Sequence, residues 1–258
     1  MLYGLLPGGK KIRSKILFDV GSIFKINKKT ILQVAAAVEC IHAYSLIHDD
    51  LPCMDNDNLR RGKLTTHKKF SESTAILAGN SLLTIAFQIL SQKKLNLSEK
   101  KKIKLINSLS ESSGHSGIAG GQYLDLSYEK MKKNKKQIID MQIKKTGKLF
   151  SFCCVAPIIM SDKIKYLGMF NKIGNEIGLL FQIADDLIDL KGNTSSVGKK
   201  TRKDLKMGKA TLISLLGTKN TIKYANKLKL NLFKSLNKFG KKSRDLKETI
   251  NYILSRTK

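Results

Sequence analysis

Two long apolar stretches each run directly into a cluster of aspartates, and this pattern constrains the fold more than any other feature. The clusters hold seven of the 20 acidic residues in a chain with 48 Lys and Arg, namely Asp49, Asp50, Asp55 and Asp57, then Asp185, Asp186 and Asp189. Neighbouring carboxylates repel one another, and burying them is costly unless a cation compensates. Oxygen-rich clusters of this kind suit Mg²⁺. The sequence therefore predicts a helical protein that presents two metal-binding clusters.

The hydrophobic pattern is helical along nearly the whole chain. It predicts helices near 11–24, 30–51, 72–91, 97–119, 134–160, 163–190 and 209–255, the last one broken. Thr30 is a plausible N-cap, and Pro52 should stop the second helix just after Asp50. No lasting β-alternation, no repeat and no interdomain linker is visible. We therefore expect one all-α domain over residues 1–258.

The cysteines and the most apolar segment predict the cellular location of the protein. None of the four cysteines has metal-ligand spacing, and an adjacent pair cannot bridge easily; they are Cys40, Cys53, Cys153 and Cys154. They indicate reduced thiols in the cytoplasm. The stretch 31–47 carries Gln33, Glu39 and His42, which is typical of a buried helix and not of a membrane span. We expect a cytoplasmic protein without integral membrane association.

The net charge of +28 raises the alternative of nucleic-acid binding. Only six basic residues are Arg, and Lys is spread along the chain. The Lys-rich runs at 100–104 and 132–136 lack the interleaved aromatic residues of base-stacking sites. This distribution favours a solvated surface, so we expect no nucleic-acid partner.

The first aspartate cluster ends a helical face that also carries a histidine. His42, Ser45 and Asp49 are three and four residues apart, so they share that face. A histidine at such a position is often a packed core residue, but the adjacent charge cluster favours ligand contact. Downstream, Arg60 and Arg61 form either a local salt bridge or a bidentate phosphate site, for which Arg geometry is well suited.

The second cluster has clearer spacing. Gln182, Asp185 and Asp189 lie at i, i+3 and i+7 on one helical face, with Asp186 beside them. Carboxylates four residues apart destabilise an isolated helix by about 0.2–0.5 kcal/mol. A solvated acidic face is the simple alternative, but the surrounding residues are apolar. The pattern again favours a metal site.

Several basic elements stand out by their context. Lys10 and Arg13 follow a glycine pair, Lys145 and Thr146 precede a glycine within a helical window, and Lys199 and Lys209 flank the end of a glycine-bearing stretch at 191–208. This stretch is a candidate lid. A further motif, Gly120-Gly121-Gln122 with Asp125, interrupts a helical pattern where each glycine costs about 1 kcal/mol. Such glycines indicate close backbone packing or approach to a ligand.

The order of these motifs resembles that of a known family. The motifs are Gly-Gly-Lys-x-x-Arg (8–13), His-x6-Asp-Asp-x4-Asp with Arg-Arg (42–61), Gly-Gly-Gln-x-x-Asp-Leu (120–126), Lys-Thr-Gly (145–147), Phe-Gln-x-x-Asp-Asp-x-x-Asp (181–189), Gly-Lys (198–199) and Gly-Lys-x-Thr (208–211). Together they are similar to the trans-isoprenyl diphosphate synthases, most closely the bacterial farnesyl diphosphate synthases. The resemblance covers nearly the whole chain. It implies an antiparallel helical bundle around a deep central cavity.

The resemblance implies condensation of isopentenyl diphosphate with dimethylallyl or geranyl diphosphate, with release of diphosphate. Asp49 and Asp55 would hold two Mg²⁺ and Asp185 a third, supported by Asp50 and Asp189. Arg60, Lys145 and Lys199 would bind the allylic diphosphate, with Lys209 as a further substrate contact. The isopentenyl diphosphate would be held by Lys10, Arg13, His42 and Arg61. Thr146 and Gln182 would turn their oxygens toward the carbocation.

The resemblance also implies a product length. Tyr44 and Ser45 occupy the positions that control chain length just before the first cluster, and an aromatic residue there stops growth at fifteen carbons. An ideal helix places Tyr44 about 140° from Asp49, so the helical wheel alone does not put it in the pocket. A geranylgeranyl diphosphate synthase, with a twenty-carbon product, remains the alternative.

Two other classes compete with this reading, and the start of the chain departs from the family pattern. Terpene cyclases share the first aspartate motif but usually not the second, and a non-catalytic partner subunit would show degraded motifs. Only seven residues precede Gly8, where family members usually carry another helix. Ser14 also replaces the usual proline. The family implies a homodimer.

Overall fold

The chain folds as a bundle of helices, as the hydrophobic pattern predicts. The computed structural model describes residues 1–6, 8–191 and 208–256. Its helices are α1 (Leu2–Leu5), α2 (Ile12–Ile23), α3 (Lys28–Asp49), α4 (Thr66–Lys69), α5 (Glu72–Ser91), α6 (Glu99–Ser113), α7 (Ile118–Ser127), α8 (Lys135–Gln142), the π-helix η1 (Ile143–Gly147), α9 (Lys148–Met160), the 3₁₀ helix η2 (Ile164–Tyr166), α10 (Leu167–Lys191), α13 (Leu212–Leu236), the 3₁₀ helix η3 (Asn237–Ser243) and α14 (Arg244–Ser255). The all-α fold class is confirmed.

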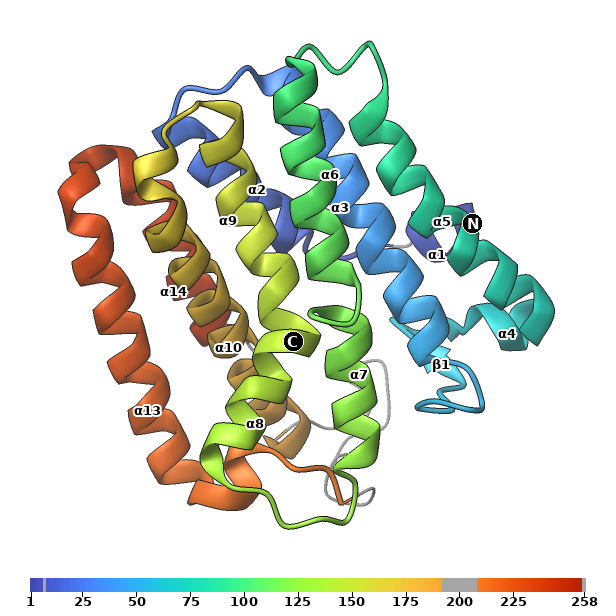
Figure 1. Ribbon diagram of the computed structural model, residues 1–258. Coiled ribbons are helices and arrows are strands. Elements are labelled where there is room, and N and C mark those ends of the chain that lie inside the picture. Colours follow the sequence, from blue (N-terminus) through green and yellow to red (C-terminus); the bar gives the residue numbers. More distant parts are fainter. Residues whose placement is uncertain (7, 192–207, 257–258) are drawn as a thin grey trace.

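Helix α9 is the centre of the bundle. Every residue from Leu149 to Met160 is buried, and α2, α6 and α10 pack against it (Figure 1). Helix α3 packs along α5 and is buried along much of its length. These long core helices place the functional side chains at their ends, because their middles are taken up by apolar packing.

Both aspartate clusters lie at the same end of the bundle. Helix α3 ends at Asp49, just before Pro52, and the second cluster occupies the last turns of α10 (Figure 1). The N-cap of α3 is Asn27, whose side chain accepts a hydrogen bond from the backbone N–H of Lys29. The expected cap at Thr30 is therefore wrong, because Thr30 is a buried residue within the first turn.

A short hairpin follows the first cluster and is not apparent from the hydrophobic pattern. Strands β1 (Leu59–Arg60) and β2 (Lys63–Leu64) pair antiparallel, and Arg61 and Gly62 form the turn with φ of 53° and 75°. Positive φ at both central residues is characteristic of a type I′ turn. The hairpin separates the side chains of two arginines that are adjacent in sequence.

Glycines shape the helices where backbones approach closely or bend. The predicted last helix is broken at Gly217 and Gly240, which have φ of 73° and 54°. Gly120 and Gly121 do not end a helix but lie within α7, where a Cβ on Gly121 would overlap the backbone of Lys145. The close packing expected from this glycine pair is therefore confirmed.

Two helices are long and apolar enough to cross a membrane by length and composition alone. In the most apolar window of α3, 56% of the residues are buried, whereas in that of α5 only 33% are. Helix α3 is thus a core helix of the bundle, and α5 has an apolar face that the chain itself does not cover. All four cysteines are free thiols.

Candidate active site

A pocket opens between the two aspartate clusters. Carboxylates of Asp49, Asp55 and Asp57 line one side, and those of Asp185, Asp186 and Asp189 line the other. The same pocket is lined by most of the predicted polar site residues, namely Arg13, His42, Ser45, Arg60, Arg61, Lys145, Thr146, Gln182 and Lys209. The structure therefore brings together motifs that are more than 100 residues apart in sequence.

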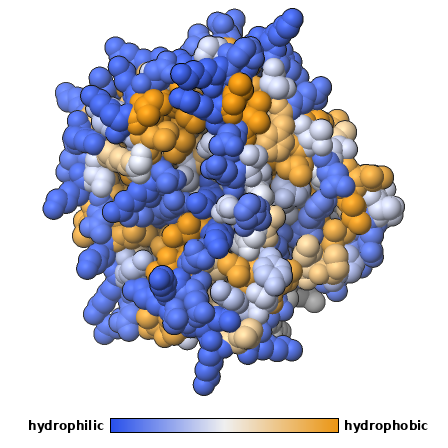
Figure 2. Space-filling model, viewed as in Figure 1, coloured by the Kyte–Doolittle hydropathy of each residue, from blue (hydrophilic) through white to orange (hydrophobic). Residues whose placement is uncertain are grey.

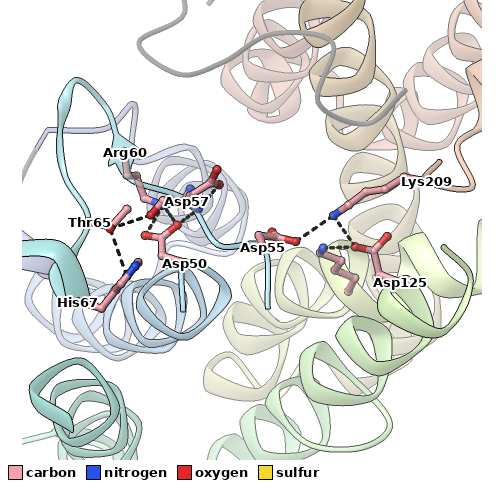
Figure 3. A network of polar contacts seen from close by, with 9 residues as sticks. Asp50, Asp55, Asp57, Arg60, Thr65, His67, Asp125 and Lys209 are labelled. Atoms are coloured by element: carbon pink, nitrogen blue, oxygen red, sulfur yellow. Dashed lines mark hydrogen bonds and ion pairs between the residues drawn. The ribbon is translucent and has the colours of Figure 1, made fainter. Parts of the chain in front are cut away.

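Within the first cluster, Asp50 differs from its neighbours. Its carboxylate accepts hydrogen bonds from Arg60 Nε at 2.8 Å and from Arg60 Nη2 at 2.5 Å (Figure 3). The Asp50 side chain is only 4% exposed, and the residue is not part of the pocket lining. The local salt bridge, one of the two alternatives for the arginine pair, is thus present for Arg60, while Arg60 itself still borders the pocket.

Asp55 belongs to a second polar network, which it shares with Asp125 and two lysines. Lys209 Nζ lies 3.0 Å from Asp55 Oδ1 and 3.0 Å from Asp125 Oδ2, and Lys145 Nζ lies 2.6 Å from the same Asp125 oxygen (Figure 3). Burial raises the pKa of Asp125, but the charges of Lys145 and Lys209 outweigh it and hold that pKa below its ordinary value. Asp125 is therefore the anchor that orients two lysines toward the pocket.

Asp49 also faces the pocket, and nearby cations compensate its negative charge less completely. Burial raises the pKa of its carboxyl to about 6, and the charges of Asp55 and Asp50 add to the effect, whereas Lys145 and Arg60 oppose it. A carboxylate whose charged form is destabilised by burial and by neighbouring negative charges is strongly stabilised by an added cation. The donor set thus fits a divalent ion at Asp49.

The second cluster is held by amide and hydroxyl groups. Thr146 Oγ1 donates to Gln182 Oε1 at 2.9 Å, and Gln182 Nε2 donates to Asp186 Oδ1 at 2.8 Å. The π-helix η1 presents Lys145 and Thr146 at this point, and π-helical turns are frequent at functional sites. Asp185 and Asp189 line the pocket from the same helix.

Among residues 1–6, 8–191 and 208–256, no three His, Cys, Asp or Glu side chains gather closely enough to hold a metal ion by themselves. Mg²⁺ is commonly bound by one or two carboxylates together with phosphate oxygens of a substrate. Carboxylates on two walls of one pocket fit that mode. The donors suit metal ions that arrive with a diphosphate and not a closed protein cage.

A second pocket adjoins the first and is basic. Its lining includes the glycine pair Gly8–Gly9 and a group of cations, namely Lys10, Lys11, Arg13, Arg61 and Arg256, together with His42 and Phe181. Arg13, His42, Arg61 and Phe181 line both pockets. All four residues predicted to bind the second diphosphate therefore lie in one place.

Arg13 carries the clearest indication of an anion ligand in this basic pocket. Its guanidinium stacks on Phe150, 4.7 Å from the ring centroid, and Nη1 lies 3.3 Å from His42 Nε2. Its Nε is buried and has no hydrogen-bond partner within the described part of the chain. Burial and the charge of Arg13 lower the pKa of His42 well below its ordinary value, so the imidazole is neutral.

Lys11 and Ser14 both interact with Glu39, another residue in the lining of this pocket. Lys11 Nζ lies 2.9 Å from Glu39 Oε2, and Ser14 Oγ donates to Glu39 Oε1 at 2.5 Å. Glu39 precedes His42 by one helical turn on α3. The serine that departs from the family pattern is thus hydrogen-bonded to a residue that borders the same pocket.

Arg256 is a site residue that sequence reasoning missed. It follows α14, its side chain is only 6% exposed, and its Nη2 lies 2.8 Å from Asp185 Oδ1. The guanidinium also stacks on Phe181, 4.0 Å from the ring centroid. An isolated arginine near the end of the chain carries no local signal, because only tertiary folding brings α14 beside α10.

The two residues predicted to control chain length differ in position. Ser45 lines the central pocket, while Tyr44 packs edge-on against His48 at a centroid distance of 5.4 Å. His48 Nε2 in turn lies 3.2 Å from the carbonyl oxygen of Ile76 on α5. Lys199 and nearly all of the expected lid at 191–208 fall at 192–207, outside the described residues.

Comparisons with known proteins agree with this geometry. The polyprenyl synthetase family model matches residues 1–253. The chain is 40% identical to farnesyl diphosphate synthase of Escherichia coli, over 100% of this chain and 88% of that protein. An FPP/GFPP synthase from Zymomonas mobilis has a similar structure, with a TM-score of 0.87, 39% identity, and coverage of 95% of this chain and 84% of that one. A geranyltransferase from Helicobacter pylori complexed with magnesium and isoprenyl diphosphate also has a TM-score of 0.87. It is 33% identical, and the match covers 98% of this chain and 85% of that one.

Proposed function

The chain belongs to the polyprenyl synthetase family, and we infer that it is a farnesyl diphosphate synthase. It condenses isopentenyl diphosphate with dimethylallyl or geranyl diphosphate and releases diphosphate. The observation that carries this function is the pair of adjoining pockets, one lined by both aspartate clusters and one by cations. Two diphosphate substrates need two such sites that share a wall.

The aspartate-lined pocket takes the allylic diphosphate. We assign Asp49, Asp55 and Asp185 to three Mg²⁺ ions, with Asp189 in support, and Asp50 to the orientation of Arg60. When bound, the metal ions neutralise the charge of the departing diphosphate. Lys145, Lys209 and Arg60 add fixed positive charge around this pocket, and Lys199 is proposed to join them.

The basic pocket takes isopentenyl diphosphate. The unpartnered Nε of Arg13 and the adjacent Lys10 and Arg61 supply hydrogen-bond donors for its phosphate oxygens. Neutral His42 can donate one further hydrogen bond without adding charge. We add Arg256 to this set, because it lines the pocket and is oriented by Phe181.

The reaction itself requires little from side-chain acids or bases. The allylic C–O bond breaks, a new carbon–carbon bond forms to the isopentenyl double bond, and the proton lost afterwards goes to the departing diphosphate. Thr146 and Gln182 direct oxygen atoms toward the developing cation, which is preorganised electrostatic stabilisation. The apolar lining from Ile118, Met141 and Phe181 limits access of water to the cation.

We propose that Tyr44 and Ser45 set the product at fifteen carbons. The contact of Tyr44 with His48, which is itself tied to α5, makes this part of α3 stiff. Ser45 borders the pocket directly. A chain that grows along α3 would meet these two residues one turn above Asp49.

We also propose that the protein is a single-domain homodimer of the cytoplasm. Helix α5 is apolar but only one-third buried in its most apolar window, and its Leu77 is 65% exposed. Figure 2 shows apolar side chains interrupting the otherwise hydrophilic surface. A second copy of the chain, with the same apolar face, is the simplest cover for α5.

The first experiment is product analysis by mass spectrometry. Purified protein is incubated with Mg²⁺, isopentenyl diphosphate and geranyl diphosphate, with an Asp49→Asn variant as the inactive control. A fifteen-carbon diphosphate supports the proposal in full. A twenty-carbon product would keep the condensation and contradict the role of Tyr44 and Ser45. Absence of condensation in folded protein would contradict the function.

A further inference from the structure

The seam between α10 and the helical segment that contains η1 carries a ladder of side-chain hydrogen bonds. One rung joins Thr146 to Gln182 at 2.9 Å, and the other joins Gln142 Nε2 to Asp186 Oδ2 at 3.3 Å. Within α10, Gln182 Nε2 also donates a hydrogen bond to Asp186 Oδ1 at 2.8 Å, which connects the two rungs. In each helical segment the two bridging residues are four positions apart. The earlier residue of one segment pairs with the later residue of the other, so the two segments run antiparallel.

Glycines fix the register of this ladder. A Cβ on Gly178 would overlap the Cα of Gly147, one residue beyond Thr146, and a Cβ on Gly174 would overlap the backbone of Ser151. The two segments thus pack backbone against backbone, which leaves short side chains able to bridge them. Ser151 Oγ donates to Asn171 Oδ1 at 2.5 Å farther along the same seam.

Both carboxylate oxygens of Asp186 accept hydrogen bonds in this ladder. Asp186 is 5% exposed, and each carboxylate oxygen accepts an amide N–H from a different glutamine. A carboxylate can only accept hydrogen bonds. Gln142 and Gln182 must therefore both turn their NH₂ groups toward Asp186.

This requirement decides which end of Gln182 reaches Thr146. With its NH₂ group held by Asp186, Gln182 must present its carbonyl oxygen to the Thr146 hydroxyl and to the pocket. If the amide rotated by half a turn, the NH₂ group would face the pocket instead. A developing carbocation is stabilised by an oxygen there and destabilised by the positive end of an N–H dipole.

We propose that Gln142 is a positioning residue for the condensation, acting through Asp186 to fix the orientation of the Gln182 amide. This inference rests on the proposed function. Gln142 lies 3% exposed at the end of α8, borders the pocket, and has a buried Oε1 with no partner within the described part of the chain. Its only hydrogen bond among those described is the one to Asp186. In this scheme Asp186 serves as an anchor for two amides, and Asp185 and Asp189 face the metal ions.

The test compares three substitutions of Gln142 in the full-length enzyme. Gln142→Leu and Gln142→Glu remove the donor, while Gln142→His keeps an N–H at similar reach. We expect kcat to fall about tenfold in Gln142→Leu, the effect of one lost hydrogen bond to a charged group, with both KM values changed less than about twofold. Gln142→Glu should fall further because its carboxylate repels Asp186, and Gln142→His should restore most of kcat.

A second readout separates positioning from general damage. With geranyl diphosphate, Gln142→Leu should release a larger share of geraniol per farnesyl product, because a poorly stabilised cation is captured by water more often. Ser151→Ala removes a hydrogen bond of the same seam away from Asp186 and should leave kcat and the geraniol share unchanged. Circular dichroism and thermal melting check that each variant is folded.

Specific results would overturn the inference. Unchanged kcat in folded Gln142→Leu, or equal losses in Gln142→Leu and Gln142→His, would show that the donor does not matter. An effect of Ser151→Ala as large as that of Gln142→Leu would show that the seam as a whole is responsible. If the wild-type protein itself condensed nothing, the proposed function would fail instead, before any variant is compared.

Discussion

The two aspartate clusters solve the same electrostatic problem in different ways. In the first, the buried carboxylate of Asp50 is neutralised by a charged partner, Arg60. In the second, the buried carboxylate of Asp186 is held by two neutral amides. Each cluster thus uses one aspartate as an anchor for other side chains, and of the two anchors Asp186 borders the pocket while Asp50 does not. A run of acidic residues is therefore not a run of equivalent ligands.

The difference lies in what each anchor controls. Arg60 borders the pocket, so the ion pair with Asp50 places a positive charge where we propose that a phosphate binds. The amides of Gln142 and Gln182 carry no net charge, and Asp186 instead sets the direction of a dipole beside Thr146. In the proposed reaction, the Asp50 anchor therefore acts on the leaving group and the Asp186 anchor acts on the cation.

The largest expected effect separates the proposed metal ligands from the anchors. Asp49→Asn and Asp185→Asn should each lower kcat by about three orders of magnitude, because each removes a proposed metal ligand and several kcal/mol of charge stabilisation. Asp186→Asn should cost clearly less. Steady-state assays at saturating Mg²⁺ measure this, and equal losses in all three variants would erase the distinction between ligand and anchor.

The next largest effect concerns the stability of the first anchor. Asp50→Asn leaves Arg60 without its buried carboxylate and should lower the free energy of unfolding by about 3 kcal/mol. Asp186→Asn weakens the hydrogen bonds with the two neutral amides and should cost about 1–2 kcal/mol. Urea unfolding of the metal-free variants measures both values. A larger loss in Asp186→Asn would invert the comparison.

A third effect concerns pH. Burial raises the pKa of Asp49 to about 6 from an ordinary 3.8, so the folded state binds a proton more tightly than the unfolded state. The stability from this proton is complete below about pH 4 and is lost as pH rises through 6, a change of about 3 kcal/mol. We expect Asp49→Asn to remove this component from the pH dependence of unfolding in metal-free protein.

Asp57→Asn is the matched control for this pH effect, since it removes a carboxylate from the same cluster and leaves Asp49 in place. The midpoint of urea unfolding, followed from pH 4 to pH 8, gives the comparison. A component near pH 6 that persists in Asp49→Asn would assign the proton to another group.

The smallest predicted effect tests the link between the second cluster and the basic pocket. Arg256→Ala should raise the KM for isopentenyl diphosphate about tenfold, the value of one charge-assisted contact. The KM for geranyl diphosphate should change much less. Arg244→Ala, which removes an exposed arginine from the start of the same helix, is the control. A selective rise in the geranyl diphosphate KM would instead place Arg256 on the allylic side.

Much of the architecture was predictable because helices leave a local periodic signal. The apolar pattern located the core helices α3, α9 and α10, and the spacing of Gln182, Asp185 and Asp189 placed them on one face. Local signals also misled in places. Asn27 and not Thr30 caps α3, and the hairpin around Arg61 depends on a turn with positive φ that carries only one glycine.

The roles of individual aspartates could not be predicted in the same way. Asp50 and Asp186 look like members of their clusters, yet their partners decide their function, and the partner of Asp186 from the other helix lies 44 residues away. Asp125 was recognisable only as part of a motif, and its contact with Lys209 spans 84 residues. Arg256 had no local signal at all.

The sequence by itself determined the helical class, the two aspartate clusters and the likeness to a family of diphosphate-using enzymes, because periodicity, spacing and motif order are properties of the chain. Only the tertiary structure decided which carboxylates anchor other side chains, and that Arg256 joins the site. The physical reason is that hydrogen bonds and ion pairs act over a few ångströms. Side chains far apart in the chain come within that range only when helices pack, here with glycines at the closest contacts.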